Sequence, residues 1–190
     1  GIQTLRKSIP AGEGINVSLP AVEINDAPRF SYRGAMLDVS RHFFPVEDIK
    51  SFIDMIALHN INRFHWHLSD DQGWRIEIKC RPLLTEKGSK RPETVIGRNS
   101  GKYDGTPHEG FYTQEQIKEI IAYAADQHIT IIPEIDLPGH MLAALAAYPQ
   151  FGCTGGPYEV WGDWGISDDV LCAGNEKAML FLEDVLAEIC

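Results

Sequence analysis

The sequence has little positive charge, few cysteines and no long apolar run. Lys and Arg number 17 against 27 Asp and Glu, which gives a formal net charge of −10. This acidity argues against a nucleic-acid or anionic-membrane partner, because a polyanion is not attracted to a surface of its own sign. No stretch approaches the roughly 20 apolar residues of a membrane span, and the first seven residues do not form a signal peptide. The acidic charge does not argue against a neutral substrate.

The four cysteines form no Cys-x-x-Cys pair, so neither a zinc knuckle nor a thioredoxin-type motif is indicated. They are widely spaced, at Cys80, Cys153, Cys172 and Cys190. The sequence is compatible with a disulfide between Cys153 and Cys172 and does not establish one. No internal repeat or low-complexity segment is visible.

With 190 residues and 44% hydrophobic content, the chain has enough apolar material for a sizeable core. Three strands are predicted, each followed by a loop and then a helix. The strands are residues 30–40, 63–68 and 129–135, the last nearly continuous apolar and so expected to be covered on both faces. Strand, helix and strand in this order form right-handed crossovers and hence a parallel sheet.

The helices are predicted over residues 45–57, from the capping box at Thr113 onward, and over 175–189. Residues 74–79 alternate like a further short strand, and residues 81–110 form a loop too long to be mere connection. Three such units match part of a (β/α)₈ TIM barrel, an α/β fold.

The most informative stretch runs from Arg63 to Trp74. Its alternation sends Phe64, Trp66 and Leu68 to one face of a strand and the histidines to the other. The strand ends in Asp70-Asp71-Gln72-Gly73. The carboxyl end of a parallel strand is where α/β folds place ligand chemistry, although the same four residues are also good turn formers.

Polar side chains near all three strand exits are expected to converge on one rim. They are Arg33, Asp38 and His42, then Asp70 and Asp71, then Glu134, Asp136 and His140. Carboxylates and a guanidinium beside aromatics suit a sugar, whose hydroxyls take hydrogen bonds while its ring face stacks. For Arg33, a structural ion pair with Asp38 or Asp70 is the alternative.

A metal site is the competing chemical interpretation. His65-x-His67 followed by acidic and imidazole groups at later strand ends is an array found in hydrolytic barrels. Both histidines precede the strand end, however, and no convincing His-rich set completes the array. We therefore expect no metal and no cofactor.

Three segments resemble the successive motifs of family 20 glycoside hydrolases, the β-N-acetylhexosaminidases. They are Tyr32–Phe43 (YRGAMLDVSRHF), His65–Arg75 (HWHLSDDQGWR) and Pro133–His140 (PEIDLPGH). The resemblance implies two parts, residues 1–25 as the end of a preceding α/β domain with a linker, and residues 26–190 as the N-terminal portion of the barrel, truncated before strand four.

By this resemblance Arg33 would hold the 3- and 4-hydroxyls of the terminal sugar, and Asp70 and His140 would form a supporting pair. Asp136 would lie beside them and tune the acid. The partner would be a glycan ending in N-acetylhexosamine, and an exported location would be expected.

The family's reaction retains configuration, with the substrate's 2-acetamido group as nucleophile. The Asp-Glu pair that the family uses stands in a His-x-Gly-Gly-Asp-Glu context, which this sequence does not contain. The catalytic pair is therefore expected after Cys190, and the chain alone is expected to be inactive. A metal-dependent hydrolase using His65 and His67, or a sugar-binding protein without catalysis, remain alternatives.

Overall fold

The computed structural model describes residues 2–10, 12, 18–19, 21–98 and 100–190. Its centre is a three-stranded parallel sheet in the order β1 (Gly34–Asp38), β2 (Arg63–His67) and β7 (Thr130–Glu134). Asp38 pairs with His67, and His67 pairs with Glu134, so the last residues of the three strands lie in one row. The loops that follow the strands therefore leave the sheet at one rim.

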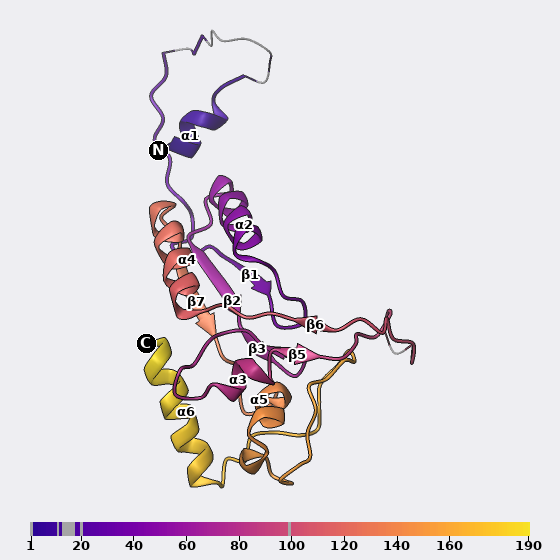
Figure 1. Cartoon of the computed structure of the whole chain (residues 1–190). Coiled ribbons are helices and arrows are strands. Elements are labelled where there is room, and N and C mark those ends of the chain that lie inside the picture. The colour runs from indigo at the N-terminus through magenta and orange to yellow at the C-terminus, as the bar shows by residue number, and fades with distance from the viewer. Residues whose placement is uncertain (1, 11, 13–17, 20, 99) are drawn as a thin grey trace.

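Two helices pack beside this sheet, α2 (Val46–Leu58) and α4 (Gln114–Asp126) (Figure 1). Phe64 and Trp66 are fully buried, with Phe64 5.1 Å from the ring of Phe52 in α2. This burial confirms the predicted alternation along β2. The predicted capping box is also present, because Thr113 and Gln116 exchange hydrogen bonds at the start of α4.

The third strand is the last one of this partial barrel. Thr130 and Pro133 are exposed within the described residues, and the other residues of β7 are half-buried. Among the described strands, β7 pairs with β2 alone. Its coverage on both faces stays a prediction for the whole barrel.

The predicted strand over residues 74–79 is wrong. Of these residues only Trp74 lies in a strand, Gly73–Trp74 (β4), antiparallel to Ser69–Asp70 (β3), while Ile76 forms an isolated bridge with Tyr112. The next residues bond to different segments, since the Arg75 N–H donates to the carbonyl of Leu68 and its own carbonyl accepts from Tyr112. No continuous ladder can form with two different partners.

The remaining elements surround the carboxyl end of the sheet or lie beyond its amino end (Figure 1). They are α1 (Ile2–Lys7), α3 (Leu83–Glu86), β5 (Lys90–Arg91), β6 (His108–Glu109), α5 (Leu142–Ala147), the 3₁₀ turn η1 (Pro149–Phe151) and α6 (Glu176–Ile189). The last helix, capped by Asn175, lies where it was predicted and buries Ala178, Phe181 and Val185.

The arrangement is that of a partial (β/α)₈ barrel, as predicted. None of the helices in the described ranges is both long and apolar enough to cross a membrane. All four cysteines are free, and a hydrogen bond with Cys172 raises the pKa of the Cys153 thiol. The disulfide that the sequence left open is therefore not formed in this structure.

Candidate active site

Three side chains from three strand exits meet at the rim. Arg41 follows β1, Asp70 follows β2 and His140 follows β7. The Arg41 Nη2 atom lies 2.7 Å from Asp70 Oδ2, and His140 Nδ1 lies 2.9 Å from Asp70 Oδ1. The Asp70 carboxylate is wholly buried, whereas the side chains of Arg41 and His140 keep 26% and 23% of their surface exposed. The buried Asp70 carboxylate thus holds the partly exposed side chains of Arg41 and His140 at the rim.

The turn after β1 places Arg41 at this rim. Asp38 Oδ1 accepts hydrogen bonds from the backbone N–H groups of Ser40 and Arg41, which closes the exit turn. The other oxygen of Asp38 accepts from Arg41 Nη1 at 2.9 Å, and Gln72 Oε1 accepts from Arg41 Nε at 2.9 Å. The guanidinium is therefore held in one orientation by side chains.

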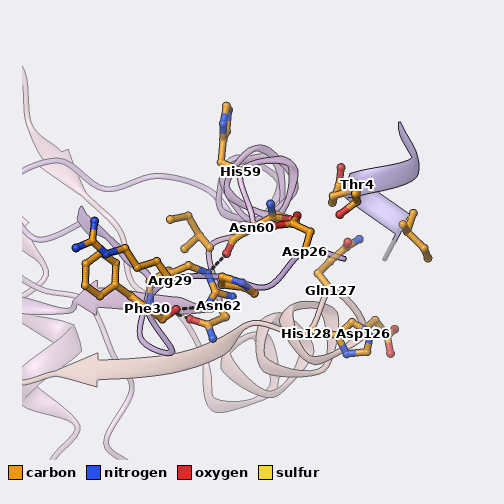
Figure 2. A pocket seen from close by; sticks show the side chains of 16 residues that line it. Thr4, Asp26, Arg29, Phe30, His59, Asn60, Asn62, Asp126, Gln127 and His128 are labelled. Atoms are coloured by element: carbon orange, nitrogen blue, oxygen red, sulfur yellow. Dashed lines mark hydrogen bonds between the residues drawn. The ribbon is translucent and has the colours of Figure 1, made fainter. Parts of the chain in front are cut away.

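Arg33 does not reach the rim, so its predicted position is wrong. It precedes β1 and lies at the amino end of the sheet, where it lines a hollow of about 860 Å³ that also includes Asn60 and Asn62 (Figure 2). Its Nε donates to the carbonyl of Asn60 at 2.6 Å, and its Nη1 donates to that of Phe30 at 2.7 Å. In the described ranges it makes no ion pair with Asp38 or Asp70.

Arg41, which the sequence analysis did not select, stands at the rim where Arg33 was expected. Arg33 and Arg41 flank the same strand, and only Arg41 follows its carboxyl end. Ligands are met at the carboxyl ends of parallel strands, so the sequence itself carries a signal that separates Arg41 from Arg33.

Asp70 and Asp71 are adjacent but have opposite electrostatics. Burial alone would raise the pKa of Asp70, but hydrogen bonds from His67 and from the Asp71 backbone N–H, together with the Arg41 charge, lower it below its ordinary value. Burial raises the pKa of Asp71, against the hydrogen bonds that it accepts. Asp70 therefore remains the anion of the cluster.

The Asp71 carboxylate is used by the fold. It accepts from the backbone N–H of Leu142 at 3.1 Å and from that of Ser167 at 3.0 Å, and its side chain is wholly buried. It therefore joins the start of α5 to the loop before α6. Asp71 and Gln72 also form the turn between β3 and β4, which confirms the turn interpretation of these residues.

The other predicted rim residues divide into two groups. Glu134 accepts from the sheet histidines, and a carboxylate oxygen of Asp136 lies within 4.8 Å of ligand atoms of His67 and Asp70. His42 instead is exposed and its ring lies 4.9 Å from that of His108, away from the cluster. The structure therefore places Asp136 near Asp70 and His67 and leaves His42 away from them.

The backbone at His140 is unusual. Its φ is 56°, in the left-handed region that residues other than glycine rarely adopt. Asn60 and His128 share this conformation, but each follows a helix end, where it is common. His140 follows no helix, and its strained backbone aims the ring at Asp70.

The cluster does not fit a metal. Two sets have ligand atoms within 4.8 Å of one another, one of His67, Asp70 and Asp136 and one of Asp70, Asp71 and His140. Both depend on Asp70, which already holds the Arg41 cation at 2.7 Å. Both ring nitrogens of His67 face carboxylate oxygens, Nδ1 at 2.6 Å from Glu134 and Nε2 at 2.7 Å from Asp70. A metal ligand needs a free lone pair, and His67 has no nitrogen left to supply one.

The sequence and the fold have known relatives. The family model "Glycosyl hydrolase family 20, catalytic domain" matches residues 30–190. A β-hexosaminidase of Porphyromonas gingivalis is 51% identical over 100% of this chain and 24% of its own length, and one of Akkermansia muciniphila is 40% identical over 100% and 37%. A solved β-N-acetylhexosaminidase of Streptomyces coelicolor has a TM-score of 0.86 at 38% identity, over 99% of this chain and 37% of that one.

Proposed function

The chain belongs to glycosyl hydrolase family 20, and on this premise we propose that the protein containing it removes terminal β-linked N-acetylhexosamine from glycans. The chain spans about a quarter to two fifths of the length of these relatives. The proposal thus concerns the whole protein, of which residues 1–190 supply one wall of the site.

The observation that carries the proposal is the Arg41–Asp70–His140 cluster at the rim, with contacts of 2.7 and 2.9 Å. A guanidinium with a fixed orientation and partial exposure is suited to bind two neighbouring hydroxyls of a sugar, because its N–H groups form a planar fork. Arg41 takes this role in place of Arg33. The hydroxyls would approach its exposed side, opposite the carboxylates that hold it.

Asp70 and His140 act as a supporting pair, and Asp136 lies beside them. Because the Asp70 carboxylate is buried and lies 2.9 Å from His140 Nδ1, it gives the His140 ring one orientation. The pair is thus suited to hold and tune an acid group that lies next to it. A carboxylate oxygen of Asp136 lies within 4.8 Å of ligand atoms of Asp70 and His67, on the Asp70 side of the pair.

The reaction that we propose is substrate-assisted and retaining, so the 2-acetamido oxygen of the substrate attacks the anomeric carbon. It requires an acid/base and a group that orients the acetamide. Three rim carboxylates are already engaged: Asp38 with Arg41, Asp70 with Arg41 and His140, and Asp71 with two backbone N–H groups. The sequence also contains no His-x-Gly-Gly-Asp-Glu motif, so we place the acid/base outside residues 1–190 and expect these residues alone to be inactive.

Three further assignments accompany this proposal. Residues 1–25 form the end of a preceding domain with its linker, and residues 26–190 belong to the catalytic barrel, in line with the family match that begins at residue 30. The substrate is a glycan or oligosaccharide. We place the protein in an exported compartment, since the glycans of this proposal lie outside the cytoplasm.

The test compares an aryl N-acetyl-β-glucosaminide with the matching aryl β-glucoside, using the longest product of the gene beside residues 1–190. The longer protein should prefer the acetamido sugar by at least about 1,000-fold, because a well-placed internal nucleophile has a very high effective concentration. Residues 1–190 alone should give no turnover. Equal cleavage of both sugars would contradict the mechanism, and binding of N-acetylglucosamine without cleavage by the longer protein would indicate a sugar-binding role.

A further inference from the structure

His67 lies beneath the Asp70–His140 pair and has no role in the function proposed above. It is the last residue of β2, and its side chain is 5% exposed. Its Nε2 atom lies 2.7 Å from Asp70 Oδ2, and its Nδ1 atom lies 2.6 Å from Glu134 Oε2. Both ring nitrogens thus face carboxylate oxygens, from two different segments.

These two contacts determine the protonation of the ring. A neutral imidazole carries one N–H donor and one lone pair, so one of its nitrogens would direct a lone pair at a carboxylate. Two carboxylates are satisfied together only by an imidazolium, which donates from both nitrogens. The geometry therefore requires a buried cation between Asp70 and Glu134.

The surrounding charges agree with this assignment. Burial alone would lower the pKa of His67, but the hydrogen bonds to Asp70 and Glu134, with the charge of Asp38, raise it to about 9. The opposing group is Arg41, whose Nη1 atom lies 3.3 Å from His67 Nε2. The three carboxylates outweigh this one neighbouring cation.

We propose that His67 is a positioning residue, an imidazolium that ties Asp70 to Glu134 and fixes the orientation of the Asp70 carboxylate. His67 and Arg41 share Oδ2 of Asp70, which leaves Oδ1 for His140 and for the backbone N–H of Asp71. The role in catalysis rests on the proposed function, because Asp70 and His140 serve the reaction there.

His65 offers a matched control within the same strand. Its Nε2 atom lies 2.5 Å from the same Glu134 oxygen, but its side chain is 39% exposed and its contact with this network is through Glu134. Replacing His65 removes one partner of Glu134 and leaves the bond between His67 and Asp70 in place. Comparison of the two variants thus separates the effect on Asp70 from the effect on Glu134.

The experiment uses the longest product of the gene and its variants His67→Gln and His65→Gln, with the aryl N-acetyl-β-glucosaminide as substrate. Glutamine retains one N–H donor and removes the positive charge. Without the imidazolium, the pKa of Asp70 rises, so Asp70 becomes protonated at higher pH. In His67→Gln the acid limb of the kcat/KM profile should move upward by about 1 pH unit, kcat should fall at least about tenfold, and KM should change little.

The profile of His65→Gln should superimpose on that of the unaltered enzyme. If the acid limb of His67→Gln does not move, or if both variants move it equally, the proposal is overturned. A general loss of packing would lower kcat without moving the limb, so the pH profile distinguishes positioning from structural damage.

A second measurement does not depend on activity. A histidine pKa raised from 6.5 to about 9 stabilises the fold fully below pH 6.5, and this stabilisation is lost as the pH rises through 9. The urea midpoint should therefore decline between these pH values in the unaltered enzyme and in His65→Gln. A flat midpoint would overturn the proposal. If the enzyme lacks acetamido-dependent hydrolysis, the proposed function fails, and this measurement still decides whether His67 is charged.

Discussion

Arg33 and Arg41 lie at opposite ends of the same unit, one before β1 and one after it, and their guanidinium groups have different partners. Arg33 donates to the backbone carbonyls of Asn60, Phe30 and Ser31. Arg41 instead contacts the side chains of Asp38, Asp70 and Gln72. The first arrangement joins segments of chain, and the second assembles a cluster of charges.

The difference shows what makes an arginine available for chemistry. Backbone carbonyls are neutral and fixed by the fold. An arginine that donates to them supplies hydrogen bonds to carbonyl groups that no helix or strand satisfies. Carboxylates hold a guanidinium through charge and orient its remaining donors toward an open side. At the amino end, Arg33 donates to backbone carbonyls beside a hollow that is also lined by Asn60 and Asn62 and by the carboxylates of Asp26 and Asp126 (Figure 2). At the rim, carboxylates contact Arg41 directly.

The largest expected effect comes from removing the negative charge of Asp70, which contacts Arg41, His67 and His140. Asp70→Asn leaves Arg41, His67 and His140 without their common anion, so kcat/KM on the aryl N-acetyl-β-glucosaminide should fall at least about 100-fold. The free energy of unfolding should fall by about 3 kcal/mol or more, because the buried His67 loses the carboxylate at its Nε2 atom. Steady-state kinetics and urea denaturation measure the two quantities.

The matched control for this change is Asp126→Asn, which alters an exposed carboxylate that lines the hollow at the amino end. It should change the free energy of unfolding by no more than about 0.5 kcal/mol and leave the kinetics unchanged. If Asp70→Asn keeps activity comparable to this control, the rim cluster is not part of the catalytic site.

The smallest expected effect lies at the amino end itself. Asn62 accepts from the backbone N–H of Arg33 at 3.0 Å and donates to the carbonyl of Ser31 at 2.9 Å. Asn62→Ala removes both bonds and should lower the free energy of unfolding by about 1–2 kcal/mol. Its kinetic constants should equal those of the unaltered enzyme. A change in KM would show that the two ends of the sheet are coupled.

Several features of the fold could be predicted from the sequence because they depend on local pattern. The alternation around Trp66 fixed which face of β2 is buried, and Thr113 with Gln116 marked the start of α4. These features depend on neighbours in the chain. The order of strands then followed from the rules for parallel crossovers.

Contacts between distant segments could not be predicted in the same way. The partner of Arg33 is a carbonyl 27 residues away, and that of His67 is Glu134, 67 residues away. Sequence reasoning therefore placed Arg33 at the rim and did not identify the two carboxylates that His67 contacts.

The most direct measurement substitutes lysine for each arginine in the longest product of the gene. Lysine keeps the charge but loses the planar fork. Arg41→Lys should lower kcat/KM for the aryl N-acetyl-β-glucosaminide by about 10- to 100-fold, through loss of hydrogen bonds to the sugar. Arg33→Lys should leave kcat/KM unchanged and lower only the free energy of unfolding. An equal kinetic loss in both variants, or a loss confined to Arg33→Lys, would contradict the assignment of the site to the carboxyl end of the sheet.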